Sequence, residues 1–83
     1  MRRLVLYGRD DCHLCDEARA MLREILAEAP DLELTAVDID SDDELLKRYL
    51  ERIPVIELDG RIVSELVPAP AALRAVLLHT SAR

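Results

Sequence analysis

The sequence predicts an α/β fold, a mixed four-stranded sheet with helices on both faces, in the element order βαβαββα. Three observations predict it. An apolar run that ends at Gly8 leads into a long helical pattern. A second strand and a capped helix follow, and two β-rich runs joined by Asp59 and Gly60 then predict a hairpin before the last helix. A chain of 83 residues suffices for one domain, which we assign to residues 1–83.

The first half of the chain predicts a parallel βαβ unit. Residues 4–7 are short and apolar on both faces, as expected of a buried strand. Residues 13–29 repeat apolar side chains at helical spacing, and Pro30 ends this helix because the residue before a proline resists helical geometry. Apolar and polar residues alternate over residues 32–38, which predicts the second strand.

The second half predicts a helix, a hairpin and a final helix. Ser41 and Glu44 have the spacing of a capping box, so we expect a helix that begins there and ends near residue 51 or 52. Residues 53–58 and 61–65 form the strands of the hairpin. Pro70 fits the first turn of the last helix, whose inward-facing residues we expect to be Leu73, Val76, Leu77 and Thr80.

Charge and hydropathy exclude several classes of partner. The net charge of −6 and the pI of about 4.8 argue against a nucleic-acid partner, because phosphates would be repelled by most of this surface. No apolar run approaches the length that spans a membrane, and the run before Gly8 is too short for the core of a signal peptide. We therefore expect a cytoplasmic protein, in a compartment where thiols are kept mostly reduced. We also expect a monomer.

Cys12 and Cys15 are the only cysteines, and they lie where the first strand leads into the first helix. The positive end of a helix dipole and its unpaired N–H groups favour a thiolate over a thiol. An attacking thiolate forms a mixed disulfide, which a second sulfur one helical turn away can resolve. A redox-active dithiol is therefore the favoured hypothesis, because so small a ring is a poor structural staple. A half-site for metal and an inert pair are the alternatives.

Two metal hypotheses have weaker support. Zinc requires four ligands, and His13 and His79 are poorly placed to complete a site with the two cysteines, so metal would require two chains. The acidic run over residues 38–44 lacks the glycine turn and the late glutamate of a calcium loop, and helix capping explains most of it. We expect no metal site within one chain.

Opposing charges surround the pair. Arg9 and a protonated His13 would lower the pKa of the Cys12 thiol, whereas the acidic residues around it would raise that pKa; these are Asp10, Asp11, Asp16 and Glu17. The acidic neighbours argue against a strongly oxidising pair, so we predict a reductant. Each of the two basic residues also has a plainer interpretation, His13 as a solvent-facing helix residue and Arg9 as a solvated loop charge.

Two segments, residues 4–15 and residues 52–55, resemble the glutaredoxin-like members of the thioredoxin superfamily, and the resemblance covers essentially the whole chain. It implies a thioredoxin-like fold, with Cys12 as the nucleophile and Cys15 as the resolving cysteine. It also implies a cis peptide bond before Pro54, and a backbone at Ile53 that binds the substrate chain. Arg9 stands where the family often carries a basic residue, three places before the first cysteine.

The sequence departs from the family pattern at two places. The family's Gly-Gly turn after the last strand corresponds here to residues 64–68, which contain no glycine, and this argues against glutathione binding. The aromatic residue common in or beside the motif is replaced by His13 and Leu14. We expect no tightly bound cofactor.

The resemblance predicts a thiol–disulfide oxidoreductase that reduces disulfides of protein or small thiol partners. The external reductant would be glutathione or a reductase. The alternatives are an iron–sulfur or metal-carrying module and a non-catalytic binding domain of the same fold, because fold alone does not establish catalysis.

Overall fold

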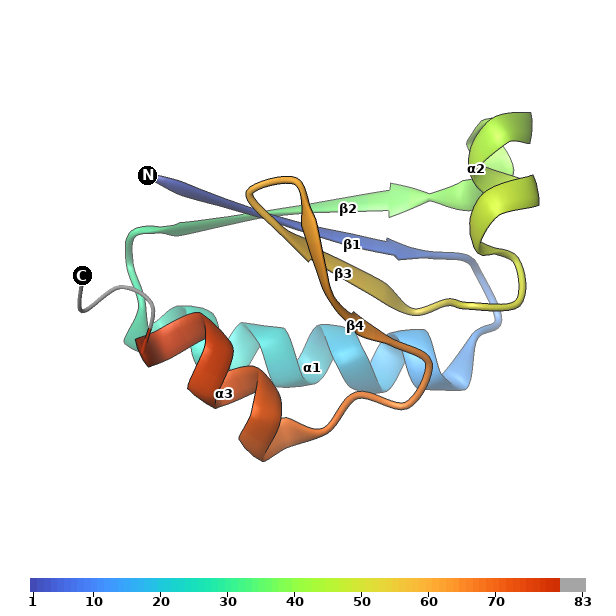
Figure 1. Ribbon diagram of the computed structural model, residues 1–83. Helices are drawn as coiled ribbons and strands as arrows, with labels where there is room; N and C mark the ends of the chain where they lie inside the picture. The colour runs from blue at the N-terminus through green and yellow to red at the C-terminus, as the bar shows by residue number, and fades with distance from the viewer. Residues whose placement is uncertain (80–83) are drawn as a thin grey trace.

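The computed structural model describes residues 1–79 and confirms the predicted order of elements (Figure 1). The elements are β1 (Arg2–Gly8), α1 (His13–Glu28), β2 (Leu32–Asp38), the short 3-10 helix η1 (Ile39–Ser41), α2 (Asp43–Tyr49), β3 (Val55–Leu58), β4 (Arg61–Glu65) and α3 (Pro70–His79). Thr80, expected to face inward, lies outside the described residues.

The four strands form one mixed sheet in the order β2-β1-β3-β4. β1 pairs in parallel with β2, with Leu4 opposite Leu34, and antiparallel with β3, with Tyr7 opposite Val55. β3 and β4 form the predicted antiparallel hairpin, with a register shift between Ile56 and Glu57. The central position of β1 places its last residue, Gly8, between the two neighbouring strands.

Helices cover both faces of the sheet, as predicted. α1 and α3 pack against one face (Figure 1), where the main core forms from Leu4, Leu6, Leu22, Ile25, Ile56 and Leu77. α2 lies toward the opposite face, beside the end of β2, and a smaller cluster of Ile39, Tyr49 and Val55 packs there with Tyr7. The two clusters arise because successive side chains of a strand point to opposite faces.

The capping-box prediction for α2 is wrong. Asp42 is the N-cap, and its Oδ1 accepts the N–H groups of Glu44 at 2.8 Å and Leu45 at 3.3 Å. Ser41 instead ends the 3-10 helix, where its hydroxyl donates to the carbonyl of Asp38 at 2.6 Å. The inserted 3-10 turn moves the helix start one residue along the chain, so the Asp carboxylate takes the capping role.

Other boundaries differ by a few residues. β1 extends to both sides of residues 4–7, and α2 ends at Tyr49 rather than at residue 51 or 52. β3 begins at Val55, so Ile53 and Pro54 precede the strand instead of opening it. None of the helices within residues 1–79 is long and apolar enough to cross a membrane.

Candidate active site

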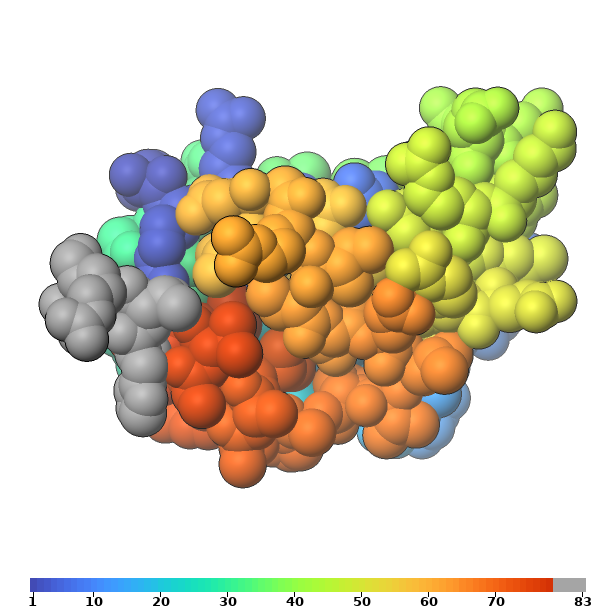
Figure 2. Space-filling view, in the orientation of Figure 1, coloured from blue at the N-terminus to red at the C-terminus, as the bar shows by residue number. Residues whose placement is uncertain are grey.

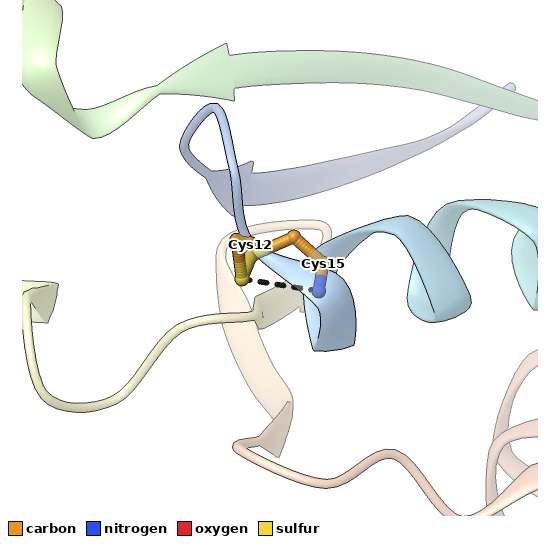
Figure 3. The surroundings of a disulfide bond; sticks show 2 residues. All are labelled: Cys12 and Cys15. Atoms are coloured by element: carbon orange, nitrogen blue, oxygen red, sulfur yellow. Dashed lines mark hydrogen bonds between the residues drawn. A yellow bond between two sulfur atoms is a disulfide. The ribbon is translucent and has the colours of Figure 1, made fainter.

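Cys12 and Cys15 form a disulfide at the N-terminus of α1, with their Cα atoms 5.2 Å apart (Figure 3). Cys12 is the N-cap residue, with extended backbone angles (φ −115°, ψ 104°), and Cys15 lies in the first turn. The structure therefore places both sulfurs at the helix terminus that the sequence predicted.

Backbone N–H groups at this terminus point toward Cys12. The N–H of Cys15 donates to Cys12 Sγ at 3.1 Å, and the N–H of Asp16 donates to the Cys12 carbonyl at 3.0 Å. When the disulfide is reduced, an N–H in this position stabilises a thiolate at Cys12 more than a thiol. The N-cap geometry thus favours ionisation of Cys12 over Cys15.

Burial also separates the two sulfurs. Cys12 is half-buried, whereas the side chain of Cys15 is enclosed, with 1% of the residue exposed. A substrate disulfide can therefore approach Cys12, while Cys15 is reached from within the protein or through Cys12. This is the asymmetry expected of an attacking and a resolving sulfur.

Gly8 permits the close approach of Cys15 to the sheet. A Cβ atom built on Gly8 would lie 3.1 Å from Cys15 Sγ and 3.2 Å from its Cβ. From the sequence pattern, Gly8 was expected only to end a strand. Its position four residues before the first cysteine was the available signal, because glycine at such a point often marks a close backbone approach.

The peptide bond between Ile53 and Pro54 is cis, as the family resemblance implied, and Pro54 is fully buried. Because Tyr7 pairs with Val55, the antiparallel register places Pro54 at the level of Gly8. Gly8 in turn pairs with Asp38 of β2. The ends of β1 and β2 and the start of β3 therefore meet at the level where Cys15 lies against the sheet.

The two predicted basic residues are both engaged by carboxylates. Arg9 Nη2 lies 3.3 Å from Asp40 Oδ1, so this loop cation is paired with the turn after β2. His13 Nε2 lies 2.8 Å from Glu17 Oε2, and its side chain is 86% exposed. Both residues are close to the dithiol in sequence. In the structure, the side chain of His13 lies on the exposed surface of α1 beside Glu17.

Comparison with known proteins decides the family. The sequence matches the model of the Glutaredoxin-like domain (DUF836) over residues 3–77. The chain belongs to this glutaredoxin-like domain family. No curated protein matches the sequence significantly.

Two solved structures are similar to this glutaredoxin-like domain over most of its length. The solution NMR structure of protein Ne2328 from Nitrosomonas europaea is 31% identical, covering 90% of this chain and 89% of that one, with a TM-score of 0.75. The X-ray structure of protein XcR50 from X. campestris is 40% identical, covering 92% and 96%, with a TM-score of 0.69. Oxidised mitochondrial thioredoxin 3 from Saccharomyces cerevisiae is 18% identical, covering 94% and 77%, with a TM-score of 0.71, and confirms the thioredoxin-like fold alone.

The segment after β4 is apolar and exposed in this glutaredoxin-like domain. Leu66 has φ +60°, a conformation that glycine adopts more readily, and its N–H donates to the carbonyl of Arg52 at 3.0 Å. Leu66 and Val67 are 48% and 70% exposed. Figure 2 shows this segment in orange beside the blue start of α1. The hydrogen bond from Leu66 to Arg52 holds the segment with the exposed side chains of Leu66 and Val67 next to the residues that precede Pro54.

A polar cluster of Tyr7, Tyr49 and Glu57 lies on the face of the sheet toward α2. Glu57 accepts from the hydroxyls of Tyr7 and Tyr49, each at 3.4 Å, and the two rings lie 4.8 Å apart. Burial, followed by the negative charge of Glu57, raises the pKa of the Tyr7 hydroxyl above its usual value. Arg52, over the Tyr49 ring, also donates through Nε to Glu65 Oε1 at 3.0 Å.

The described residues offer no cluster of three or more His, Cys, Asp or Glu side chains that could hold a metal ion. The acidic residues of the turn after β2 are used locally instead. Asp38 Oδ1 accepts the N–H of Asp40 at 2.9 Å, and Asp42 caps α2. Helix capping thus accounts for the positions of both carboxylates.

Proposed function

We propose that this glutaredoxin-like domain is a thiol–disulfide oxidoreductase that reduces disulfides of protein or small thiol substrates. The observation that carries the proposal is the arrangement of the two sulfurs. Cys12 is half-exposed at a helix N-terminus and accepts a backbone N–H, while Cys15 is buried one turn behind it. This arrangement suits attack by the first sulfur and resolution by the second.

The reaction proceeds in two exchanges. The Cys12 thiolate attacks one sulfur of the substrate disulfide, forms a mixed disulfide and releases the other substrate sulfur as a thiolate. Cys15, as a thiolate, then attacks Cys12 Sγ, forms the Cys12–Cys15 disulfide and displaces the second substrate sulfur. The disulfide form described here corresponds to the end of this cycle. Two electrons from an external thiol reductant, glutathione or a reductase, return the pair to the dithiol.

The substrate would lie across Cys12 and the backbone of Ile53, next to the cis bond that leads into the buried Pro54. Pro54 offers no N–H, and the backbone of Ile53 beside it would pair with an extended substrate chain, as the family resemblance implies. The exposed side chains of Leu66 and Val67 extend this surface with apolar area, which favours a polypeptide over a small polar thiol. We therefore place protein disulfides first among the substrates.

Charge argues against tight glutathione binding. Arg9 and Arg52, which flank the predicted substrate surface in sequence, are paired with Asp40 and Glu65. The residues around Cys12 that would face an anionic tripeptide include four exposed carboxylates, Asp10, Asp11, Asp16 and Glu17. Binding an anion there would require breaking existing ion pairs in an acidic surround. Glutathione would then act as a reductant in solution rather than as a tightly held cofactor.

Composition and thiol chemistry also bear on the compartment, the partners and the oligomeric state of the domain. A reducing compartment such as the cytoplasm would keep the dithiol ready for attack. The acidic surface favours neither nucleic acid nor anionic membrane as a partner. We propose that the domain acts as a monomer, because one chain contains both sulfurs of the cycle.

The decisive test compares Cys12→Ser, Cys15→Ser and the double variant in reduction of a peptide disulfide. We expect no turnover without Cys12, and accumulation of a mixed disulfide on Cys12 in the Cys15→Ser variant. Redox titration with glutathione should give a potential below about −150 mV. Turnover that survives in the double variant would overturn the proposal. A coloured protein with sulfide-linked absorption and no reductase activity would favour the metal-carrying alternative.

A further inference from the structure

Cys15 borders a cavity on the flank of the disulfide that faces β2. The cavity has a volume of about 140 Å³, which is room for several water molecules. Gly8 of β1, Cys15 of α1 and Ala36 of β2 contribute to its wall. Because β2 and β3 lie on opposite sides of β1, this cavity is separate from the predicted substrate surface at Pro54.

Charged side chains from three elements line the cavity. They are Arg9 and Asp10 from the loop before α1, Arg19 from α1, and Asp38 from β2. Arg9 is already paired with Asp40, and Asp38 Oδ1 accepts the N–H of Asp40. Arg19 lies one helical turn after Cys15 and has no ion-pair partner among residues 1–79. Two cations and two carboxylates therefore line the cavity beside the buried sulfur, and Arg19 is the cation among them that no carboxylate of residues 1–79 holds in an ion pair.

The proposed cycle requires Cys15 to lose a proton. A thiol that is enclosed by protein ionises with difficulty, because burial disfavours the charged form. When a substrate is bonded to Cys12, the front of Cys15 is covered by that mixed disulfide. The cavity is then a polar space through which water can reach the Cys15 sulfur.

We propose that this cavity is the route by which the Cys15 thiol gives its proton to water, and that Arg19 is a positioning residue that stabilises the resulting thiolate. The inference rests on the proposed function. The S–H proton passes to cavity water and to solvent, and the thiolate attacks Cys12 Sγ. The Cys12–Cys15 bond forms, the bond from Cys12 to the substrate breaks, and its electron pair leaves on the substrate sulfur.

The first test isolates the Cys15 thiol in the full-length Cys12→Ser variant, where it is the only thiol. Its ionisation is followed by the ultraviolet absorbance of the thiolate as the pH is raised. Arg19→Gln should move the midpoint upward by about half a pH unit or more, because a nearby positive charge favours the thiolate. Arg19→Lys should restore most of the original midpoint.

Two further variants separate the effect of the Arg19 charge on the Cys15 midpoint from the effect of water in the cavity. Arg23→Gln removes a cation one turn farther along α1 that does not line the cavity, and should leave the midpoint unchanged. Ala36→Leu fills the cavity from β2 without changing its charge, and should also raise the midpoint because it removes hydration. Equal midpoints for Arg19→Gln and Arg23→Gln, or an unchanged midpoint in Ala36→Leu, would overturn the proposal.

The second test measures the resolving step in the protein with both cysteines. A preformed mixed disulfide on Cys12 is allowed to resolve in a single turnover at neutral pH. Arg19→Gln should slow this step about threefold, the same factor as half a pH unit, and leave the attack by Cys12 unchanged. A shifted Cys15 midpoint with an unchanged resolving rate would overturn the proposed role in the cycle. If the domain reduces no disulfide at all, the proposed function fails, while the Cys15 titration still tests the cavity separately.

Discussion

Gly8 lies directly against the sulfur of Cys15: a Cβ atom at Gly8 would stand 3.1 Å from Cys15 Sγ. Gly8 ends the central strand, and Cys15 is buried in the first turn of α1. The contact sets how closely the start of the helix approaches the sheet. It therefore links the geometry of the dithiol to the packing of the core.

We predict that Gly8→Ala destabilises the protein and misplaces Cys15. The added methyl group would push on a buried sulfur that the disulfide bond to Cys12 holds in place, at a cost of about 1 kcal/mol or more. Urea denaturation of the disulfide form measures this cost. The same substitution in a Cys15→Ala background should cost less, because the sulfur is absent. An equal cost in both backgrounds would show that contact with the sulfur is not the cause.

Asp42 and Ser41 are expected to differ in their effects on α2. Asp42→Ala removes the carboxylate that accepts the Glu44 and Leu45 N–H groups, and should destabilise the protein by about 1 kcal/mol. Ser41→Ala removes only the exposed hydroxyl that donates to Asp38, and should cost less. Thermal unfolding of the two variants makes the comparison. A larger loss for Ser41→Ala would instead support the capping box that the sequence predicted.

Asp31 is predicted to make stability depend on pH in the acid range. Its hydrogen bond to Arg2 at 2.6 Å, together with the charge of Arg2, holds the pKa of this carboxyl below its usual value. A carboxyl with a depressed folded pKa stabilises the protein at pH values above its unfolded pKa of about 3.9, and this stabilisation is lost as the pH falls through the folded pKa. Asp31→Asn should therefore lower the urea midpoint at neutral pH.

The difference between Asp31→Asn and the unchanged protein should shrink on acidification and vanish below the folded pKa of Asp31. Glu33→Gln, at an exposed position of the adjoining strand, serves as the matched control and should change the midpoint little at either pH. A pH-independent effect of Asp31→Asn would contradict the role of the charge.

Tyr7 should ionise at higher pH than a free tyrosine, whose pKa is about 10. Burial contributes most to the raised pKa, and the negative charge of Glu57 adds to it. Glu57→Gln should therefore lower the Tyr7 pKa only part of the way to its usual value. Alkaline titration by ultraviolet absorbance, in a Tyr49→Phe background that leaves Tyr7 as the only tyrosine, measures the change. An unaltered midpoint would contradict the contribution of Glu57.

Local patterns carried most of the fold prediction. Helical spacing after the cysteines, alternation over residues 32–38 and the Asp59-Gly60 turn each depend on near neighbours in sequence, and each predicted the correct element. The α2 cap was mispredicted because Ser41 and Asp42 are adjacent candidates. The choice between them depends on a 3-10 turn that follows the end of β2, which the capping pattern does not reveal.

In the candidate site too, the features that depend on neighbouring residues were predicted and those that depend on distant residues were not. The spacing of Cys12 and Cys15 and the helical pattern that follows them are enough to indicate a dithiol at a helix N-terminus. The ion pairs of Arg9 with Asp40 and of Arg52 with Glu65 join residues that are distant in sequence, so no local pattern predicts them. No local pattern predicts that Arg19 lines the cavity beside Cys15 either, because the helical spacing places it only on the polar side of a helix.

The sequence by itself determined the order of the elements, the position of the dithiol and the family, because these depend on residue type and spacing along the chain. Only the tertiary structure decided the depth of Cys15 against Gly8, the pairing of the nearby arginines and the cavity between α1 and β2. Those features arise where strand register and helix packing bring distant segments together, and neither is specified by the neighbours of any one residue.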